Sequence, residues 1–323
     1  MKEYGMKKVA VVGTGSIGSH LIERLRNESV EVCFVRSSKS GNQFPLDRLL
    51  DDERPDAVFL AIPTKDSGEV ARDYILECVT KGVPIITCEK GSLAYHADAL
   101  RRYLHLIGYS ATVGGGTQML KYLQDRRLHA GPVEIQAVIN GTLNFVFSEL
   151  QNGRSLDEAY QEALRLGYAE PGAKDPRSLI NGELGDVVMK TCVMLNVGFS
   201  VEKPITPKGI FFYPVDEGGL EVLATEGADY RFVVSFSNSS VPKRGYHSPI
   251  PIFTIENWSG WNVVGGFKQI TASQNWLPSG VSNAVHITEG KLGAGGKYTL
   301  SGPGAGAEPT TSAMLADFNR LCK

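Results

Sequence analysis

The first part of the chain alternates short apolar, β-branched runs with longer segments in which apolar residues recur at helical spacing. The runs predict strands at Lys8–Val12, Val30–Val35, Ala57–Ile62 and Val83–Thr87. The longer segments predict helices at Ser19–Leu25 and Gly68–Thr80. Strands that alternate with helices are joined by right-handed crossovers, so this region predicts a parallel sheet.

From about Val133 the pattern changes to alternating strands interrupted by helices. Strands are predicted at Val133–Ile139, Arg231–Phe236, Pro249–Glu256 and Asn283–Thr288. One helix begins with the capping box of Ser155 and Glu158 and stops at Gly167. Further helices are predicted at Glu183–Asn196 and Thr311–Leu321. The change in pattern indicates a second, α+β domain.

Composition narrows the class of protein. The 323 residues are 42% hydrophobic, and 33 Lys and Arg balance 35 Asp and Glu, giving a net charge of −2. This excludes a disordered chain and gives no attraction to nucleic acid or to an anionic membrane. No apolar run is long enough to span a bilayer. The five cysteines lack zinc-site spacing, which favours reduced thiols and a cytoplasmic location.

A glycine-rich motif, Gly13-Thr14-Gly15-Ser16-Ile17-Gly18, lies between the first predicted strand and the first predicted helix. In a G-x-G-x-x-G turn the first glycine permits the tight turn, the second lets a pyrophosphate approach, and the third allows close helix packing. The helix amides from Ser16 and Ile17 onward would face the phosphates. We therefore predict a Rossmann-type dinucleotide site. It also includes Ile62 and Pro63, which close the third strand.

Arg36, Ser37 and Ser38 follow the second predicted strand, where this fold contacts the ribose 2′ position. An NAD site usually carries a carboxylate there, which would repel a 2′-phosphate. An arginine and two hydroxyls favour that phosphate instead, so NADP(H) is the preferred cofactor and NAD(H) a possible one. The alternative is that Arg36 stacks on the adenine or faces solvent.

Asp186 and Lys190 lie four residues apart on one face of the second predicted helix. The alternative is a surface ion pair, but the apolar neighbours on this helix predict partial burial, which suits proton transfer. Lys90 follows the fourth strand, at the edge of the parallel sheet where ligands gather. Four glycine-containing segments remain. Taken singly, Val113–Thr117 and Asn140–Asn144 predict only turns after strands, Gly167–Pro171 predicts a helix C-cap followed by proline, and the fourth is Gly302–Gly306. The last of them resembles a backbone nest at a helix start.

Taken in order, these motifs resemble homoserine dehydrogenase over almost the whole chain. The most specific marks are Gly167-Tyr168-Ala169-Glu170 and the pair Asp186 and Lys190. The resemblance implies a Rossmann domain over residues 1–131 and 301–323, closed by the last helix. It also implies a mixed-sheet domain over 132–300 that binds substrate and forms a homodimer, and a short form without a C-terminal regulatory domain.

The resemblance further implies NAD(P)-linked interconversion of L-aspartate 4-semialdehyde and L-homoserine. Glu170 would hold the substrate amino group, and Asp186 with Lys190 would sit at the reacting carbonyl oxygen. Lys90 would lie between nicotinamide and substrate, and the acid/base role is divided between the two lysines. The remaining implied contacts are Gly141, Thr142 and Tyr168 to substrate, and Gly304 and Gly306 to cofactor.

The sequence departs from the family pattern at several positions. Glu89 replaces the usual Asn before Lys90, Ser110 replaces a Glu of a monovalent-cation loop, and Thr117-Gln118 replaces Ile-Pro. Leu179 stands at a second substrate-positioning acid, for which Asp175 from an inserted loop could substitute. Because no residues have metal-ligand spacing and Ser110 replaces the Glu of the cation loop, we predict no catalytic metal. Two alternatives stay open: a relative acting on a different amino or hydroxy acid, and a non-catalytic NADP-binding sensor in which Glu89 pairs with Lys90.

Overall fold

The chain folds into two units in a computed structural model. The model describes residues 6–28, 30–36, 46–126, 131–169, 172–238, 250–271 and 274–323. The first unit comprises residues 1–118 and 306–323, and the second comprises 119–305. The sequence suggested a division at 131 and 301. Helix α6 (Met119–Asp125) lies in the second unit, where Leu120 and Leu123 pack over Gly198.

The first unit is built on a parallel sheet of five strands in the order β2-β1-β3-β4-β5. The strands are β1 Lys7–Val12, β2 Val30–Arg36, β3 Ala57–Leu60, β4 Ile85–Thr87 and β5 Ile107–Gly108. This confirms the predicted Rossmann-type sheet. From β1 the chain moves to β2 on one side and later to β3 on the other, so a crevice opens at the carboxyl ends of β1 and β3.

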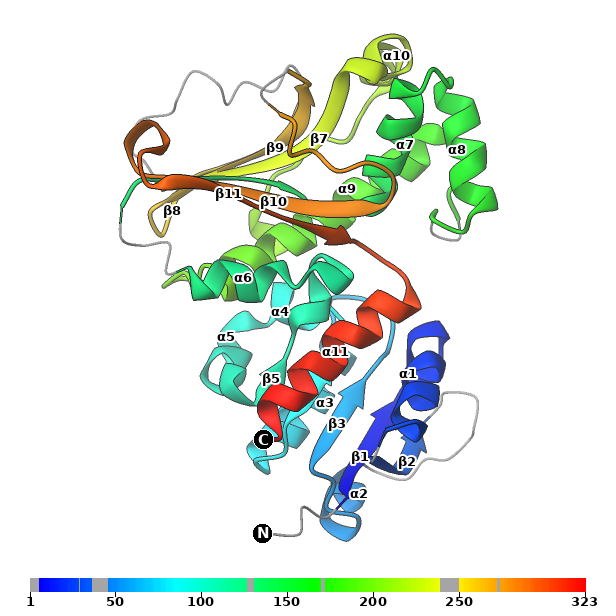
Figure 1. The fold of residues 1–323 in the computed structure, drawn as a ribbon, viewed down its shortest axis with the longest axis vertical. Coiled ribbons are helices and arrows are strands. Elements are labelled where there is room, and N and C mark those ends of the chain that lie inside the picture. The colour runs from blue at the N-terminus through cyan, green and yellow to red at the C-terminus, as the bar shows by residue number, and fades with distance from the viewer. Residues whose placement is uncertain are drawn as a thin grey trace. The chain divides into compact units, whose positions relative to one another are not determined.

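The helices of the first unit pack against this parallel sheet (Figure 1). They are α1 Ser16–Arg26, α2 Leu46–Asp52, α3 Glu69–Thr80, α4 Gly91–Tyr95, α5 Ala97–Leu100 and α11 Ala307–Leu321, with short 3-10 turns at Arg101–Leu106, Ser110–Thr112 and Gly115–Thr117. Helices α1 and α11 lie side by side and share one apolar core with the sheet. In that core Phe59 contacts Phe318, with ring centroids 5.4 Å apart.

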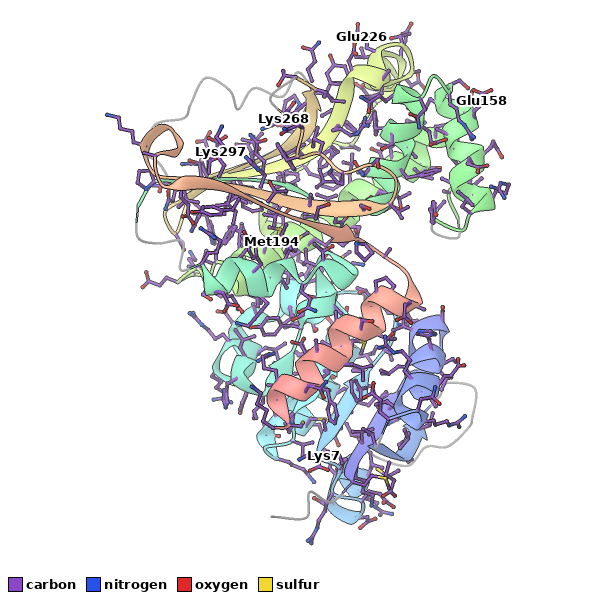
Figure 2. All side chains as sticks on the ribbon, in the orientation of Figure 1. Lys7, Glu158, Met194, Glu226, Lys268 and Lys297 are labelled. Carbon is purple, nitrogen blue, oxygen red and sulfur yellow. The ribbon has the colours of Figure 1, made fainter. Side chains whose placement is uncertain are left out.

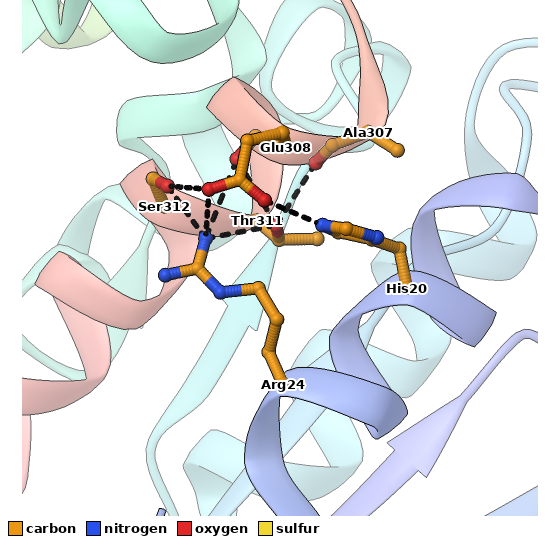
Figure 3. Close-up of polar contacts among 6 residues, drawn as sticks. All are labelled: His20, Arg24, Ala307, Glu308, Thr311 and Ser312. Atoms are coloured by element: carbon orange, nitrogen blue, oxygen red, sulfur yellow. Dashed lines mark hydrogen bonds and ion pairs between the residues drawn. The ribbon is translucent and has the colours of Figure 1, made fainter. Parts of the chain in front are cut away.

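Two polar clusters hold α11 in the first unit. Glu308 accepts from His20 Nε2 at 2.7 Å and from an Arg24 Nη at 3.1 Å, which ties α11 to α1 (Figure 3). The buried carboxylate of Asp317 accepts from both the amide (2.7 Å) and the hydroxyl (2.8 Å) of Ser110. In this chain, therefore, Ser110 anchors the closing helix from the position where the family pattern has a glutamate.

The second unit contains a six-stranded sheet in the order β11-β10-β6-β7-β9-β8. Its strands are β6 Val133–Val138, β7 Tyr230–Ser237, β8 Ile250–Trp258, β9 Trp261–Gln269, β10 Ser282–Glu289 and β11 Gly296–Pro303. The predicted α+β class is confirmed, and the described strand pairings are all antiparallel rather than mixed.

The helices of the second unit are α6, α7 Gly141–Gln151, α8 Leu156–Arg165, α9 Pro176–Val193 and α10 Glu217–Glu226. A π-helical turn at Met194–Gly198 extends α9, and 3-10 turns lie at Pro207–Gly209, Gly227–Asp229 and Lys291–Gly293. The predicted capping box of Ser155 and Glu158 is present at α8. Within the described ranges, no helix is both long and apolar enough to cross a membrane.

Candidate active site

The turn after β1 is built for close backbone approach. Gly13 has a φ of 105°, and a Cβ there would lie 2.1 Å from the carbonyl oxygen of Ala61. A Cβ on Gly18 would lie 1.9 Å from the carbonyl oxygen of Gly13. Both positions therefore require glycine, one for its conformation and both for space. The structure thus gives Gly13 and Gly18 the steric roles that the motif predicts.

Gly15, between them, differs because a Cβ there would meet no atom within 4 Å. Gly15 is exposed and precedes the first residue of α1, Ser16, and no side chain caps this helix. Ile17 packs against the core behind the turn. The first amides of α1 therefore point toward an open surface, which is the arrangement that binds a phosphate.

A cavity of about 440 Å³ lies beside this turn. It is lined by Val12, Gly13, Thr14, Gly15, Arg36, Ala61, Ile62, Pro63, Lys65, Gly68, Val70, Ala71, Tyr74 and Glu89. The cavity thus joins the ends of β1, β2 and β3 with helix α3. It brings Arg36, Ile62 and Pro63 to the same groove as the glycine turn.

Arg36 marks the β2 side of the groove. Its guanidinium carbon lies 5.3 Å from the centre of the Tyr74 ring, so Arg36 stacks on a protein ring. Burial raises the pKa of the Tyr74 hydroxyl, against the opposing effect of the Arg36 charge. Ser37 and Ser38 lie outside the described residues. The structure therefore brings one of the three predicted 2′-phosphate contacts to the groove.

Glu89 and Lys90 follow β4 on the other side of the groove. Glu89 is 2% exposed, and its carboxylate accepts from Thr64 Oγ1 at 2.6 Å, from Gly91 N at 2.5 Å and from Ser92 N at 2.9 Å. Lys90 is half-buried and occupies the cap position of α4. Glu89, which stands where the family pattern has Asn, thus accepts hydrogen bonds from the first two amides of α4.

Asp186 and Lys190 form an ion pair in the second unit. Lys190 Nζ lies 2.7 Å from Asp186 Oδ2, and the two side chains are only 15% and 12% exposed. Lys190 also donates to the carbonyl oxygen of Ile139 at 3.0 Å. The predicted partial burial of this pair is therefore observed, and the alternative of an exposed surface pair is excluded.

Asn140 and Glu183 complete this cluster, and the sequence analysis assigned no site role to either residue. The Asn140 side-chain amide donates to Glu183 Oε2 at 2.6 Å and to Asp186 Oδ2 at 3.1 Å. Its carbonyl oxygen accepts from Leu143 N and so caps α7. The signal that could have found Glu183 is its spacing, because residues 183, 186 and 190 lie on one face of a helix.

The residues predicted to bind substrate are distributed around the N-terminus of α7. Thr142 Oγ1 donates to the carbonyl oxygen of Tyr168 at 2.8 Å, and the Tyr168 ring packs edge-on against Phe145. Gly141 lies against Val281, since a Cβ there would come 2.6 Å from the Val281 carbonyl oxygen. Glu170 lies outside the described residues.

Asp175 has a structural role in α9. Its carboxylate accepts from Ser178 N at 2.6 Å as the helix cap, and this hydrogen bond lowers its pKa. Pro176 occupies the first helical position, where proline is favoured. Leu179 is buried. The cap explains why α9 starts at Pro176, seven residues earlier than the sequence analysis placed it.

The glycine-rich segment before α11 begins within a strand, since Gly302 and Pro303 end β11. Gly304 lies against the Asn283 side chain, and Gly306, with a φ of 111°, caps α11. Gln118 has a φ of 50°, which a proline cannot adopt. The replacement of the family's proline by Gln118 therefore matches the local backbone.

Comparison with known proteins shows which family the chain resembles. The chain is 25% identical over 265 residues to an NAD(+)-dependent homoserine dehydrogenase from Pseudomonas canavaninivorans, covering 78% of this chain and 66% of the relative. It is 26% identical over 344 residues to a homoserine dehydrogenase from Helicobacter pylori, covering 98% and 75%. The chain thus spans about two thirds to three quarters of these relatives.

Solved structures share the fold. A homoserine dehydrogenase from Thiobacillus denitrificans matches with a TM-score of 0.71 and 23% identity, over 98% of this chain and 73% of that one. A hyperthermophilic archaeal homoserine dehydrogenase in complex with NADPH matches with a TM-score of 0.66 and 19% identity, over 98% and 97%. The sequence model of homoserine dehydrogenase matches residues 120–318. The chain therefore belongs to the homoserine dehydrogenase family.

Proposed function

We propose that the protein is an NADP(H)-preferring homoserine dehydrogenase that interconverts L-aspartate 4-semialdehyde and L-homoserine. The observation that carries this proposal is the largely buried pair of Asp186 and Lys190, contacted by Asn140, in a chain that also has a glycine turn before an uncapped helix. The pair supplies a proton donor, and the turn supplies a place for a nucleotide.

The groove of the first unit fits a dinucleotide. The open position at Gly15 and the uncapped start of α1 would receive the pyrophosphate. The apolar walls at Ile62 and Val70 would contact the planar groups. When bound, a nicotinamide dinucleotide supplies or accepts the hydride in this chemistry.

Lys190 would hold the proton that the reaction moves. In the reductive direction an oxygen that gains negative charge needs a donor, and an ammonium aimed by a carboxylate and a backbone carbonyl is preorganised for this task. In the reverse direction the same amine would receive the proton of the hydroxyl. Lys90, in the first unit, is the other candidate for the acid/base role.

The cofactor preference rests on the charges of the groove. Arg36 and Lys65 both line it, and two cations favour a ligand with an additional phosphate. NAD(H) would bind more weakly for lack of that phosphate. The matched relatives include an NAD(+)-dependent enzyme and one crystallised with NADPH, so the preference is tested directly by comparing kcat/KM for the two cofactors.

A second candidate function is a related dehydrogenase for a different amino or hydroxy acid. It is favoured by Leu179, which is 3% exposed on α9 and cannot hold an amino group as a carboxylate would. In the main proposal Glu170 would hold that amino group, and Gly141, Thr142 and Tyr168 would contact the substrate.

The decisive experiment follows NADPH absorbance while the purified protein is mixed with L-aspartate 4-semialdehyde. We expect oxidation of NADPH, and in reverse a reduction of NADP⁺ with L-homoserine. A panel of other aldehydes and hydroxy acids run beside it distinguishes the second candidate. Folded protein that binds NADPH but turns over no member of the panel would leave only the sensor function.

We also propose a homodimer in the cytoplasm. The strand register places Lys268 on β9 and Lys297 on β11, both labelled in Figure 2, on the same face of the second sheet as Glu134, Gln136 and Thr288. On this face Lys268 is already buried within the chain: it is 6% exposed and donates to Ser235 Oγ at 2.6 Å. A second copy packing on this face would be detected by sedimentation. All five cysteines are free thiols, which suits a reducing compartment.

A further inference from the structure

Glu89 is a buried acid inside the nucleotide groove. Its carboxylate receives three donors, the hydroxyl of Thr64 and the amides of Gly91 and Ser92. Both oxygens are used as acceptors: Oε1 by Thr64 and Gly91, and Oε2 by Ser92. A carboxylate is acceptor-only when ionised, so this set of donors matches its charged form.

The surrounding glycines hold this acid in place. A Cβ on Gly91 would lie 2.7 Å from Glu89 Oε1, and a Cβ on Gly68 would lie 2.3 Å from Ser92 N. The start of α3 and the start of α4 therefore meet without intervening side chains. This close crossing fixes the Glu89 carboxylate at the wall of the groove, which it lines.

The position of Glu89 in the groove indicates which part of a dinucleotide it faces. Arg36 stands at the end of β2, and the glycine turn follows β1, so the adenosine half belongs on that side. Glu89 follows β4, on the far side of the pyrophosphate turn. In this fold the nicotinamide half occupies that side.

We propose that Glu89 is a specificity-determining residue that selects the oxidised, cationic form of the cofactor over the reduced form. This inference rests on the proposed function. The oxidised nicotinamide ring carries a positive charge and the reduced ring carries none, while the rest of the two molecules is the same. A fixed negative charge in a partly enclosed groove therefore stabilises one form only.

The same charge has a consequence for the reaction. Loss of hydride from the reduced ring creates the positive charge that Glu89 stabilises, so the carboxylate favours reduction of the aldehyde on the protein. It also makes the oxidised cofactor a tighter product inhibitor. An asparagine at this position, as in the family pattern described above, would lack both effects.

The test is a measurement of both dissociation constants in Glu89→Gln. Binding of NADPH is followed by its fluorescence, and binding of NADP⁺ by calorimetry, without substrate. We expect the ratio of the NADP⁺ constant to the NADPH constant to rise about tenfold, and the NADPH constant itself to change less than about threefold. A tenfold change in this ratio raises the reduction potential of the bound couple by about 30 mV.

Two further variants separate charge from structure. Glu89→Asn removes the charge in a second way, with the side chain that the family pattern has there, and should reproduce the higher ratio if Glu89→Gln fails to fold. Thr64→Val removes one donor to the carboxylate and keeps its charge, so its ratio should stay near that of the parent.

The outcomes are distinct. Equal weakening of both forms in Glu89→Gln and Glu89→Asn would reduce Glu89 to a helix cap and overturn the inference. An unchanged ratio would overturn it as well. A parent protein that binds neither form would overturn the proposed function and this inference together, whereas a parent that binds both with an unresponsive ratio overturns only the inference.

Discussion

The nucleotide turn of the first unit and the lysine cluster of the second unit organise their chemistry in opposite ways. At Gly13–Gly18 the backbone would bind the proposed cofactor, and Gly13 and Gly18 have no room for a side chain. Around Lys190 the contacts are made mainly by side chains, and two segments distant in the sequence supply them: α9 and the Ile139–Asn140 connection between β6 and α7. The residues of the Gly13–Gly18 turn are adjacent in the sequence, whereas the residues around Lys190 come together only when the chain folds. We call the first a backbone site and the second a side-chain site. The two sites should therefore respond differently to substitution.

The largest effect is expected at Lys190. Because this amine is the proposed proton donor, Lys190→Ala should lower kcat by about 10²- to 10⁴-fold, measured as NADPH oxidation with L-aspartate 4-semialdehyde. The matched control is Lys121→Ala. Lys121 also pairs with a carboxylate four residues along a helix, Asp125, but its side chain is 40% exposed, against 15% for Lys190, so kcat of Lys121→Ala should stay within about twofold of the parent.

A Lys190→Ala protein that folds and keeps its turnover within a few-fold of the parent would remove the proton-transfer role from this cluster. The same assay on Lys90→Ala would then show whether the other lysine carries it. If both variants lose activity, the pH profile of kcat in each separates the residue that titrates in the reaction from the one that only positions substrate.

The second effect is on the backbone site, where two neighbouring glycines give opposite results. Gly13→Ala places a Cβ against Ala61 and forces a φ of 105° on an L-residue, so we expect a loss of about 3 kcal/mol or more in unfolding free energy. Gly15→Ala meets no atom, so its stability should change by less than about 0.5 kcal/mol.

Cofactor binding distinguishes the same pair further. The Gly15→Ala methyl group would stand where the pyrophosphate approaches, so its affinity for NADPH should fall although the protein stays folded. Urea unfolding and fluorescence titration measure the two properties separately. A Gly15→Ala protein with unchanged affinity would show that the open position at the start of α1 is not the phosphate site.

The contrast between the sites also explains what the sequence could reveal. The turn at Gly13–Gly18 and the cap of α8 were predicted because each depends on residues a few positions apart. For Asn140 the local sequence predicts only a turn, because the residue that it contacts, Glu183, lies 43 positions away in the chain. The sequence analysis predicts no strand at β9, where glycines at 265 and 266 weaken the strand pattern, and in the fold the Phe253 ring lies against Gly265. Side chains from distant segments supply the missing information in each case.

The third prediction concerns the cost of a buried charge in the second sheet. Burial lowers the pKa of Lys268 to about 8. Between about pH 8 and the ordinary lysine value near 10.5, the unfolded chain binds more protons than the folded chain, so unfolding free energy should rise with pH across this window. Below about pH 8 Lys268 is charged in both states, and burial of that charge lowers the unfolding free energy by about 3 kcal/mol.

Lys268→Met should therefore flatten the pH dependence of stability between about pH 8 and 10. At neutral pH it should stabilise by about 1–2 kcal/mol, since the hydroxyl of Ser235 loses its partner and offsets part of the gain. Lys297→Met, on exposed β11, is the control and should leave the slope unchanged. Urea unfolding at several pH values measures both, and an equal slope in parent and Lys268→Met would show that the ammonium is not buried as described.

The smallest effect is expected at the most local feature, the cap of α8. Ser155 Oγ accepts from Glu158 N, and the Glu158 carboxylate accepts in return from Ser155 N at 2.8 Å. Ser155→Ala should cost about 1 kcal/mol in unfolding free energy and leave kcat and cofactor affinity unchanged. Glu158→Gln keeps a side chain that can complete the box and should cost less. A change in kcat for either variant would contradict the division drawn here, because it would couple a feature encoded by four adjacent residues to the side-chain site that only the fold assembles.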